Sequence, residues 1–171
     1  MAFAGMSSCL SCYASGIIEV VKHASSERLF LYALRLLGAR AYSEEALRQK
    51  LARRAQPEVV GAVLQRIKHL GYLDDYEYAE GYVRLHAGKW GTAKLRRALL
   101  QKGVAHEIVE RVLAQQAIER DPLEEAVALL VRYPGQHRGE KPKAMRFLKN
   151  RGYSFSQALS AWERYLEQTR S

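Results

Sequence analysis

Helix-start signals return along this chain at nearly constant intervals, and this periodicity limits the fold more than any other feature. Ser26 precedes "ERLFLYALRLLG", Asp74 precedes "DYEYAEGYVRLHAG" and Asp121 precedes "PLEEAVALLVRYPG", so the three candidate N-caps lie 48 and 47 residues apart. Apolar residues between them are spaced mostly by three and four, as in helices, and strand-like alternation is scarce. The sequence therefore predicts an all-α protein built from tandem units.

Each unit also contains a short basic segment followed by a further helix. The basic segments are "SEEALRQKLARR" (43–54), "GTAKLRRALLQKG" (91–103) and "KPKAMRFLKNRG" (141–152), with Leu51, Leu99 and Leu148 in equivalent places. The last helix of each unit is expected to begin near Pro57, Ala105 and Ser156. We therefore predict three-helix repeats over 26–73, 74–120 and 121–171, after an N-terminal extension, 1–25, that is expected to be poorly ordered.

Asp74 and Asp75 lie side by side in a chain of formal net charge +9, and this pair is either catalytic or structural. Asp74 occupies the N-cap position, Glu77 completes a capping-box spacing, and Asp75 falls in the first turn, where negative charge is favourable. Because Asp121 and Glu124 repeat the spacing, we favour the structural interpretation. The predicted structural caps are Ser26, Asp74, Glu77, Asp121 and Glu124.

The positive charge is concentrated in the basic segments and the loops that lead into them. Residues 43–54, 89–102 and 138–151 contain 15 of the 27 Lys and Arg residues and only three acids, so they carry net +12 and the rest of the chain −3. Such an excess favours an anionic partner, which is nucleic acid, an acidic protein or an anionic membrane surface.

A helical wheel of the middle basic segment separates its charges from its core face. Leu95 and Leu99 share one face, which leaves Lys94 and Arg97 pointing away from it and Arg96 toward its flank. Partner contact and a merely solvated face both explain these cations. Lys102 also falls in the last turn, where a cation stabilises the helix end. The predicted basic track consists of Arg48, Arg53, Lys89, Trp90, Lys94, Arg96, Arg97, Lys102, Lys143, Arg146 and Lys149.

Trp90 belongs to this track because it lies in the loop "HAGKWGTAK" between the first and second helices of its unit. An indole in such a loop can stack on a base or enter a protein pocket. It can equally cap the core between two helices. The sequence leaves these alternatives open.

Catalytic and metal-binding patterns are missing: there is no Walker loop, no G-x-S-x-G and no H-E-x-x-H. Cys9 and Cys12 lack the further ligands of a zinc site, and we expect a structural or incidental role. The five histidines (23, 69, 86, 106, 137) are expected in solvent or at helix ends. No stretch approaches the roughly 20 apolar residues of a membrane span. The sequence thus predicts a non-enzymatic cytoplasmic protein without cofactor or metal.

Several of these segments together resemble the RecX family of bacterial recombination regulators, over about residues 28–118. The resemblance is carried by "ALRLLGARAYSEEALRQKLARR", "VLQRIKHLGYLDDYEYAEGYVR" and "GTAKLRRALLQKGV". The third unit follows the family pattern more loosely and has a longer loop, "YPGQHRGEKP".

The resemblance implies an elongated, curved, monomeric array of helices that modulates RecA, the ATP-dependent strand-exchange protein, without being an enzyme. Family members bind along the groove of the RecA–DNA filament and interfere with its growth, ATP hydrolysis and strand exchange, which dampens recombination and the SOS response. The implied partners are the RecA filament and, weakly and non-specifically, single- and double-stranded DNA, with no membrane.

Two other functions fit the residues. Three-helix units also resemble helix-turn-helix modules, so a free-standing DNA-binding regulator is the main alternative. Against it, no unit has a helix rich in Asn, Gln and Arg at base-reading positions. An RNA-binding protein that shares only the repeat architecture is the second alternative.

Overall fold

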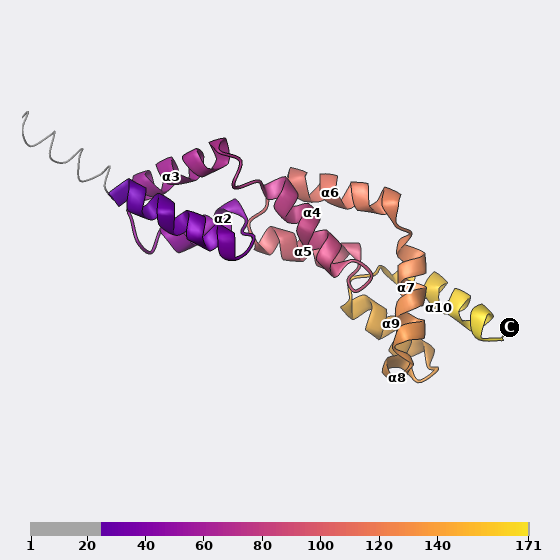
Figure 1. Cartoon of the computed structure of the whole chain (residues 1–171). Helices are drawn as coiled ribbons and strands as arrows, with labels where there is room; N and C mark the ends of the chain where they lie inside the picture. The colour runs from indigo at the N-terminus through magenta and orange to yellow at the C-terminus, as the bar shows by residue number, and fades with distance from the viewer. Residues whose placement is uncertain (1–24, 171) are drawn as a thin grey trace, which may run out of the picture. The chain divides into compact units, whose positions relative to one another are not determined.

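The computed structural model describes residues 25–170, which are helical between short loops and contain no strand in that range, so the all-α prediction is confirmed (Figure 1). The chain divides into two compact units, Met1–Asp74 and Asp75–Ser171. The predicted N-terminal extension lies, apart from residue 25, outside the described residues. The predicted boundaries between repeats and the curved shape stay predictions.

The first unit contains a helix described over 25–39, then α2 (Glu44–Leu51) and α3 (Pro57–His69). Leu47 and Leu51 of α2 are fully buried against the apolar faces of the other two helices. Ser43 is the N-cap of α2, since its hydroxyl accepts a hydrogen bond from the Ala46 N–H at 3.3 Å. The prediction of Ser26 as an N-cap is wrong, because residue 25 is already helical and Ser26 therefore lies inside the helix.

The second unit contains two helical cores in succession. The first is formed by α4 (Asp75–His86), α5 (Thr92–Gln101) and α6 (His106–Glu119). The second is formed by α7 (Pro122–Arg132), the short α8 (Pro134–His137), α9 (Lys141–Asn150) and α10 (Phe155–Arg170). Here α7 packs against α10, and α9 contacts both α8 and α10.

The equivalent leucines of the basic helices are buried as their spacing predicts. Leu51, Leu99 and Leu148 have no exposed surface, and each lies in a different one of the three cores. Burying a leucine side chain contributes about 1.5–3 kcal/mol to stability. The basic residues of these helices therefore occupy positions that are left over once the core face has been fixed.

The helix ends follow the sequence signals in part. The Asp121 carboxylate accepts a hydrogen bond from the Leu123 N–H at 2.8 Å, and Asp74 directly precedes α4, with Glu77 in its first turn. Glu124 was predicted to cap α7, but its carboxylate lies 3.9 Å from the guanidinium of Arg164, because α10 packs beside α7.

One capping box, at the start of α10, was not predicted from the sequence. The Ser154 N–H donates to the Gln157 side chain at 2.9 Å, and the Gln157 N–H donates back to the Ser154 hydroxyl at 3.1 Å. This reciprocal pair fixes the start of α10. Its signal is the serine three residues before a glutamine, next to the expected start at Ser156.

The loop "YPGQHRGEKP" contains α8, and His137 at its end is fully buried. The His137 Nε2 lies 3.1 Å from the Leu130 carbonyl, and the Gly139 N–H donates to Nδ1 at 3.2 Å. The ring also makes edge contacts with Trp162 and Tyr165. His137 therefore lies at a helix end, one of the two expected places, but it is not in solvent: the ring closes the third core.

Candidate functional site: two cationic clefts beside α9

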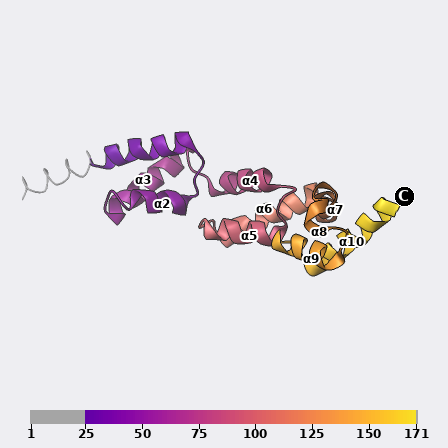
Figure 2. The same cartoon turned by 90° about the horizontal axis from the view of Figure 1, so that it is seen from below.

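The C-terminal end of α9 is hydrogen-bonded to the N-terminal end of α5. The Gly91 N–H donates to the Arg151 carbonyl at 2.7 Å, and the Ala93 N–H donates to the Gly152 carbonyl at 3.3 Å. These groups are the unpaired donors and acceptors that every helix has at its ends, so each helix satisfies the other and their dipoles meet favourably. In Figure 2, α9 accordingly follows α5 end to end.

Only glycine allows this approach. A Cβ on Gly91 would lie 2.6 Å from the Gly152 carbonyl oxygen, and a Cβ on Gly152 would lie 2.5 Å from the Lys94 Cβ. Gly152 also has a φ of +91°, which disfavours any other residue. The two glycines thus fix the basic helices α5 and α9 relative to each other.

A cleft of about 600 Å³ opens at this junction and is called the α5–α9 cleft. Four predicted track cations line it, and no acidic side chain does. Its principal lining residues are Tyr82, Trp90, Lys94, Arg97, Lys102, Lys149, Asn150 and Tyr153. The structure therefore brings together cations from basic segments about 50 residues apart in the sequence.

Aromatic rings form one wall of the α5–α9 cleft. The ring centroids of His86 and Trp90 lie 4.0 Å apart, and those of Tyr82 and His86 lie 4.3 Å apart. The Lys94 ammonium lies 4.6 Å from the Trp90 centroid, and the Lys102 ammonium lies 5.4 Å from that of Tyr82. Trp90 is half-buried against the core of α4–α6 and also faces the cleft, so core packing and a lining position are both its structural roles.

Arg96 does not belong with the cations of the cleft. Its Nε and Nη2 donate to the two carboxylate oxygens of Glu110 on α6, at 2.6 and 2.9 Å. These hydrogen bonds lower the pKa of Glu110 and raise that of Arg96. The flank of α5 faces α6, so Arg96 has a structural role in the ion pair; its predicted contact with a partner stays untested.

The remaining track residues, Arg48, Arg53 and Lys89, line neither cleft beside α9. Arg48 is paired with Glu44 at 2.5 Å and with Glu45 at 3.5 Å on its own helix. Arg53 lines a separate depression at the α2–α3 turn, and Lys89 is exposed in its loop without lining either cleft beside α9. A track that continues through the first unit stays a prediction.

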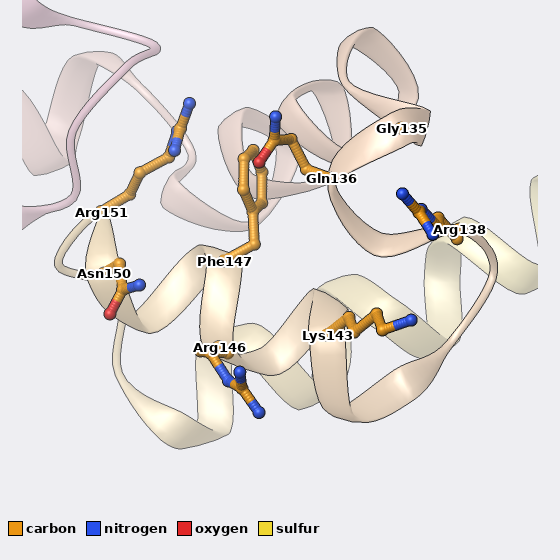
Figure 3. A pocket seen from close by; sticks show the side chains of 8 residues that line it. All are labelled: Gly135, Gln136, Arg138, Lys143, Arg146, Phe147, Asn150 and Arg151. Carbon is orange, nitrogen blue, oxygen red and sulfur yellow. The ribbon is translucent and has the colours of Figure 1, made fainter.

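A second cleft, of about 510 Å³, is lined by residues of α8, α9 and the loop between them and is called the α8–α9 cleft. Figure 3 shows Lys143 and Arg138 at one end, Arg151 at the other, and Gln136 above the Phe147 ring between them. Lys143 also pairs with Glu140 at 2.5 Å. Two of its cations, Lys143 and Arg146, were predicted as track residues, whereas Arg138 was missed because it lies before α9.

Residues 25–170 contain neither a metal site nor a membrane-spanning helix. In that range no group of three or more His, Cys, Asp and Glu side chains is arranged to hold a metal ion. None of the helices there has the length and apolarity to cross a membrane. Cys9 and Cys12 lie outside the described residues, and their structural or incidental role stays a prediction.

The fold and the clefts define an all-helical protein made of small bundles, with basic clefts beside α9. Two RecX family models match the chain: the first three-helix domain over residues 30–66 and the second over residues 74–113. A regulatory protein RecX of Thermus thermophilus is 46% identical over 131 residues, which cover 77% of this chain and 87% of the relative. The chain therefore belongs to the RecX family of regulatory proteins.

Relatives of lower sequence identity are also RecX proteins. The regulatory protein RecX of Deinococcus radiodurans is 40% identical over 137 residues, which cover 76% of this chain and 64% of the relative. The crystal structure of RecX from Lactobacillus salivarius is similar with a TM-score of 0.72 at 20% identity, over 85% of this chain and 99% of that one. A second RecX crystal structure has a TM-score of 0.73 at 22% identity, over 98% and 81%. These structures share the fold.

Proposed function

We propose that this protein is a non-enzymatic, cytoplasmic regulator of the RecA recombinase. It binds the RecA–DNA filament, inhibits filament extension, ATP hydrolysis and strand exchange, and thereby dampens recombination and the SOS response. Membership of the RecX family supports the regulatory role. The observation that carries the mode of binding is the α5–α9 cleft, where Lys94, Arg97, Lys102 and Lys149 converge without a lining acid.

The cleft is suited to an anionic filament surface because the helices that carry its cations are fixed before binding. The hydrogen bonds between Gly91 and Arg151 and between Ala93 and Gly152 fix the helices, so little ordering is required on association. Clustered cations with no lining carboxylate attract phosphates or acidic patches from a distance. Bound across the filament, the protein would block both addition of subunits and the conformational cycle that hydrolysis drives.

The function is tested by adding the purified protein to a RecA ATPase assay that depends on single-stranded DNA. Strong inhibition at substoichiometric ratios would indicate capping or disruption of filaments, and inhibition only near saturation would indicate coverage of the groove. An unchanged ATPase rate together with unchanged strand exchange would contradict the proposal.

Variants test the cleft itself. The double substitution Arg97→Ala and Lys149→Ala removes two exposed cations that line the cleft. Arg84→Ala with Arg164→Ala is a matched control, since these residues are exposed in the same unit, carry the same charge and line neither cleft beside α9. We expect the first pair to raise the concentration for half-inhibition about tenfold and the control pair to change it less than twofold. Equal effects would show that only net charge matters.

The alternative function, a free-standing DNA-binding regulator, would be supported if the protein bound one duplex sequence tightly in the absence of RecA. Its signature is an affinity for that sequence at least 10³-fold above random duplex at physiological salt, on the order expected of specific readers. A preference for RNA over DNA of the same sequence would support the second alternative.

A further inference from the structure

We infer that the α8–α9 cleft is a second, preformed binding site, and that its ligand is the phosphate backbone of a single nucleic-acid strand. The cations that build it are Arg138, Lys143, Arg146 and Arg151. This inference rests on the proposed function only for the class of partner, since DNA is present in the RecA filament. The site itself is argued from the loop that carries Arg138 and from the side chains around Phe147.

The loop that carries Arg138 is rigidly held from within. His137 is fully buried and bonded through both ring nitrogens, to the Leu130 carbonyl and the Gly139 N–H. Immediately beyond it, Arg138 has a φ of +50° and a ψ of +33°, the left-handed conformation that side chains other than glycine, asparagine and aspartate rarely adopt. A left-handed residue is common just after a helix, but glycine usually supplies it; an arginine there is strained, and such strain is concentrated at functional sites.

The left-handed backbone of Arg138 determines where its positive charge lies. Arg138 is the only residue other than glycine with a positive φ in residues 25–170, and its side chain lines the cleft beside Lys143 and Arg146 (Figure 3). A glycine there would relieve the strain, yet an arginine is present. The strained backbone therefore carries a cation to a place where Arg146 also lies and where Glu140 pairs with Lys143 alone, so the cluster keeps an excess of positive charge that an anion would offset.

The side chains of the cleft fit phosphate. Three of its four cations are arginines, whose planar forks bind phosphate oxygens in pairs. The guanidinium carbon of Arg151 lies over the protein's own Phe147 ring, 4.0 Å from its centroid, and this contact orients the side chain before binding. Gln136 and Asn150 add amide donors, and no lining residue is acidic.

A single strand is favoured because Asn150 lines both clefts. A flexible backbone with one charge per nucleotide can pass over α9 at Asn150 from the α5–α9 cleft to the α8–α9 cleft. The sugar–phosphate chain would then contact Lys149 in the first cleft and Arg146, one turn earlier on α9, in the second. A stiff duplex does not bend over a single helix in this way.

The test measures binding of fluorescein-labelled poly(dT) to the full-length protein, without RecA, over a series of salt concentrations. The double variant Arg138→Asn with Arg146→Gln removes two cations, and asparagine tolerates the left-handed backbone. The expected results are at least tenfold weaker binding and a slope of log K against log salt that is less steep by about 1.4, since each phosphate contact on a single strand contributes about 0.7. Arg138→Lys, which keeps the charge, should retain most of the slope.

Controls separate the site from net charge and from the proposed function. The pair Arg84→Ala with Arg164→Ala should leave the slope unchanged, and an equal change there would overturn the inference, as would an unaltered slope in the cleft variant. Displacement of poly(dT) by an equal charge of poly-glutamate would instead identify an acidic protein segment as the ligand. If the cleft variant loses poly(dT) binding but the wild type does not inhibit RecA, the site stands and the proposed function fails. If the wild type inhibits RecA but the cleft variant binds poly(dT) normally, the site alone is rejected.

Discussion

Arg96 and Glu110 form a two-pronged ion pair that joins α5 to α6, with the guanidinium Nε 2.6 Å and Nη2 2.9 Å from the carboxylate oxygens. The hydrogen bonds from Arg96 hold the pKa of Glu110 below its ordinary 4.5. A carboxyl group whose pKa is lower in the folded state stabilises the protein above its unfolded pKa, and this stabilisation is lost as the pH falls through the folded pKa.

We therefore predict that the contribution of Glu110 to stability is present at neutral pH and disappears in acid. The free energy of unfolding of the wild type should exceed that of Glu110→Gln at about pH 6, and the difference should vanish well below pH 4.5, the ordinary carboxyl pKa. Urea denaturation at a series of pH values measures it. A difference that stays constant down to about pH 2 would show that the carboxylate charge is not the cause.

The neighbours Arg96 and Arg97 should separate stability from binding. Arg96→Ala breaks the contact between α5 and α6 and should lower the melting temperature, while inhibition of RecA stays within twofold of wild type. Arg97→Ala should leave the melting temperature unchanged and weaken inhibition, because Arg97 is exposed and lines the α5–α9 cleft. The reverse pattern would refute the assignment of the cleft.

Gly91→Ala is predicted to be strongly destabilising, by about 2 kcal/mol or more. The new methyl group would clash with backbone atoms and force α5 and the end of α9 apart. The closest atom would be the Gly152 carbonyl oxygen at 2.6 Å. Gly81→Ala is the matched control: Gly81 lies within α4 with open space around its Cα, so the same change should stabilise the helix by about 0.5–1 kcal/mol. Chemical denaturation of both variants decides the prediction.

Tyr153 is 4% exposed, and within the described part of the chain its hydroxyl has no hydrogen-bond partner. Burial, with a smaller effect of the Glu125 charge, raises its pKa above the ordinary 10.0. An unpaired buried hydroxyl costs about 1–3 kcal/mol, so Tyr153→Phe should be neutral or stabilising. Because the unfolded tyrosine ionises first, wild-type stability falls as the pH rises past 10.0, and the advantage of the phenylalanine should widen there. Thermal melts at about pH 8 and about pH 11 measure this.

The sequence predicted those parts of the molecule that depend on local pattern. The spacing of apolar residues indicated the all-α fold, and the equivalent positions of Leu51, Leu99 and Leu148 correctly indicated one buried face on each basic helix. Asp121 was identified as a cap because its hydrogen bond reaches only two residues along the chain.

What could not be predicted depends on contacts between distant segments. A helical wheel shows that Arg96 is off the core face, but it does not reveal that Arg96 forms an ion pair with Glu110 on the next helix. Gly91 and Gly152 are far apart in sequence, and each alone is an ordinary loop or helix-end glycine. His137 has no neighbouring pattern that marks a buried ring, because its partners, Leu130, Trp162 and Tyr165, come from both sides of the chain.

The bond between the end of α9 and the start of α5 also sets an order of events during synthesis. The helices of the first unit carry a complete core of their own, so that unit can close as soon as it has left the ribosome. The first turn of α5 leaves the ribosome early. Its Gly91 and Ala93 N–H groups remain exposed to water until Arg151 and Gly152 emerge and accept their hydrogen bonds. A nascent chain that stalls before those residues would hold a finished first unit and an unfinished, protease-accessible second one.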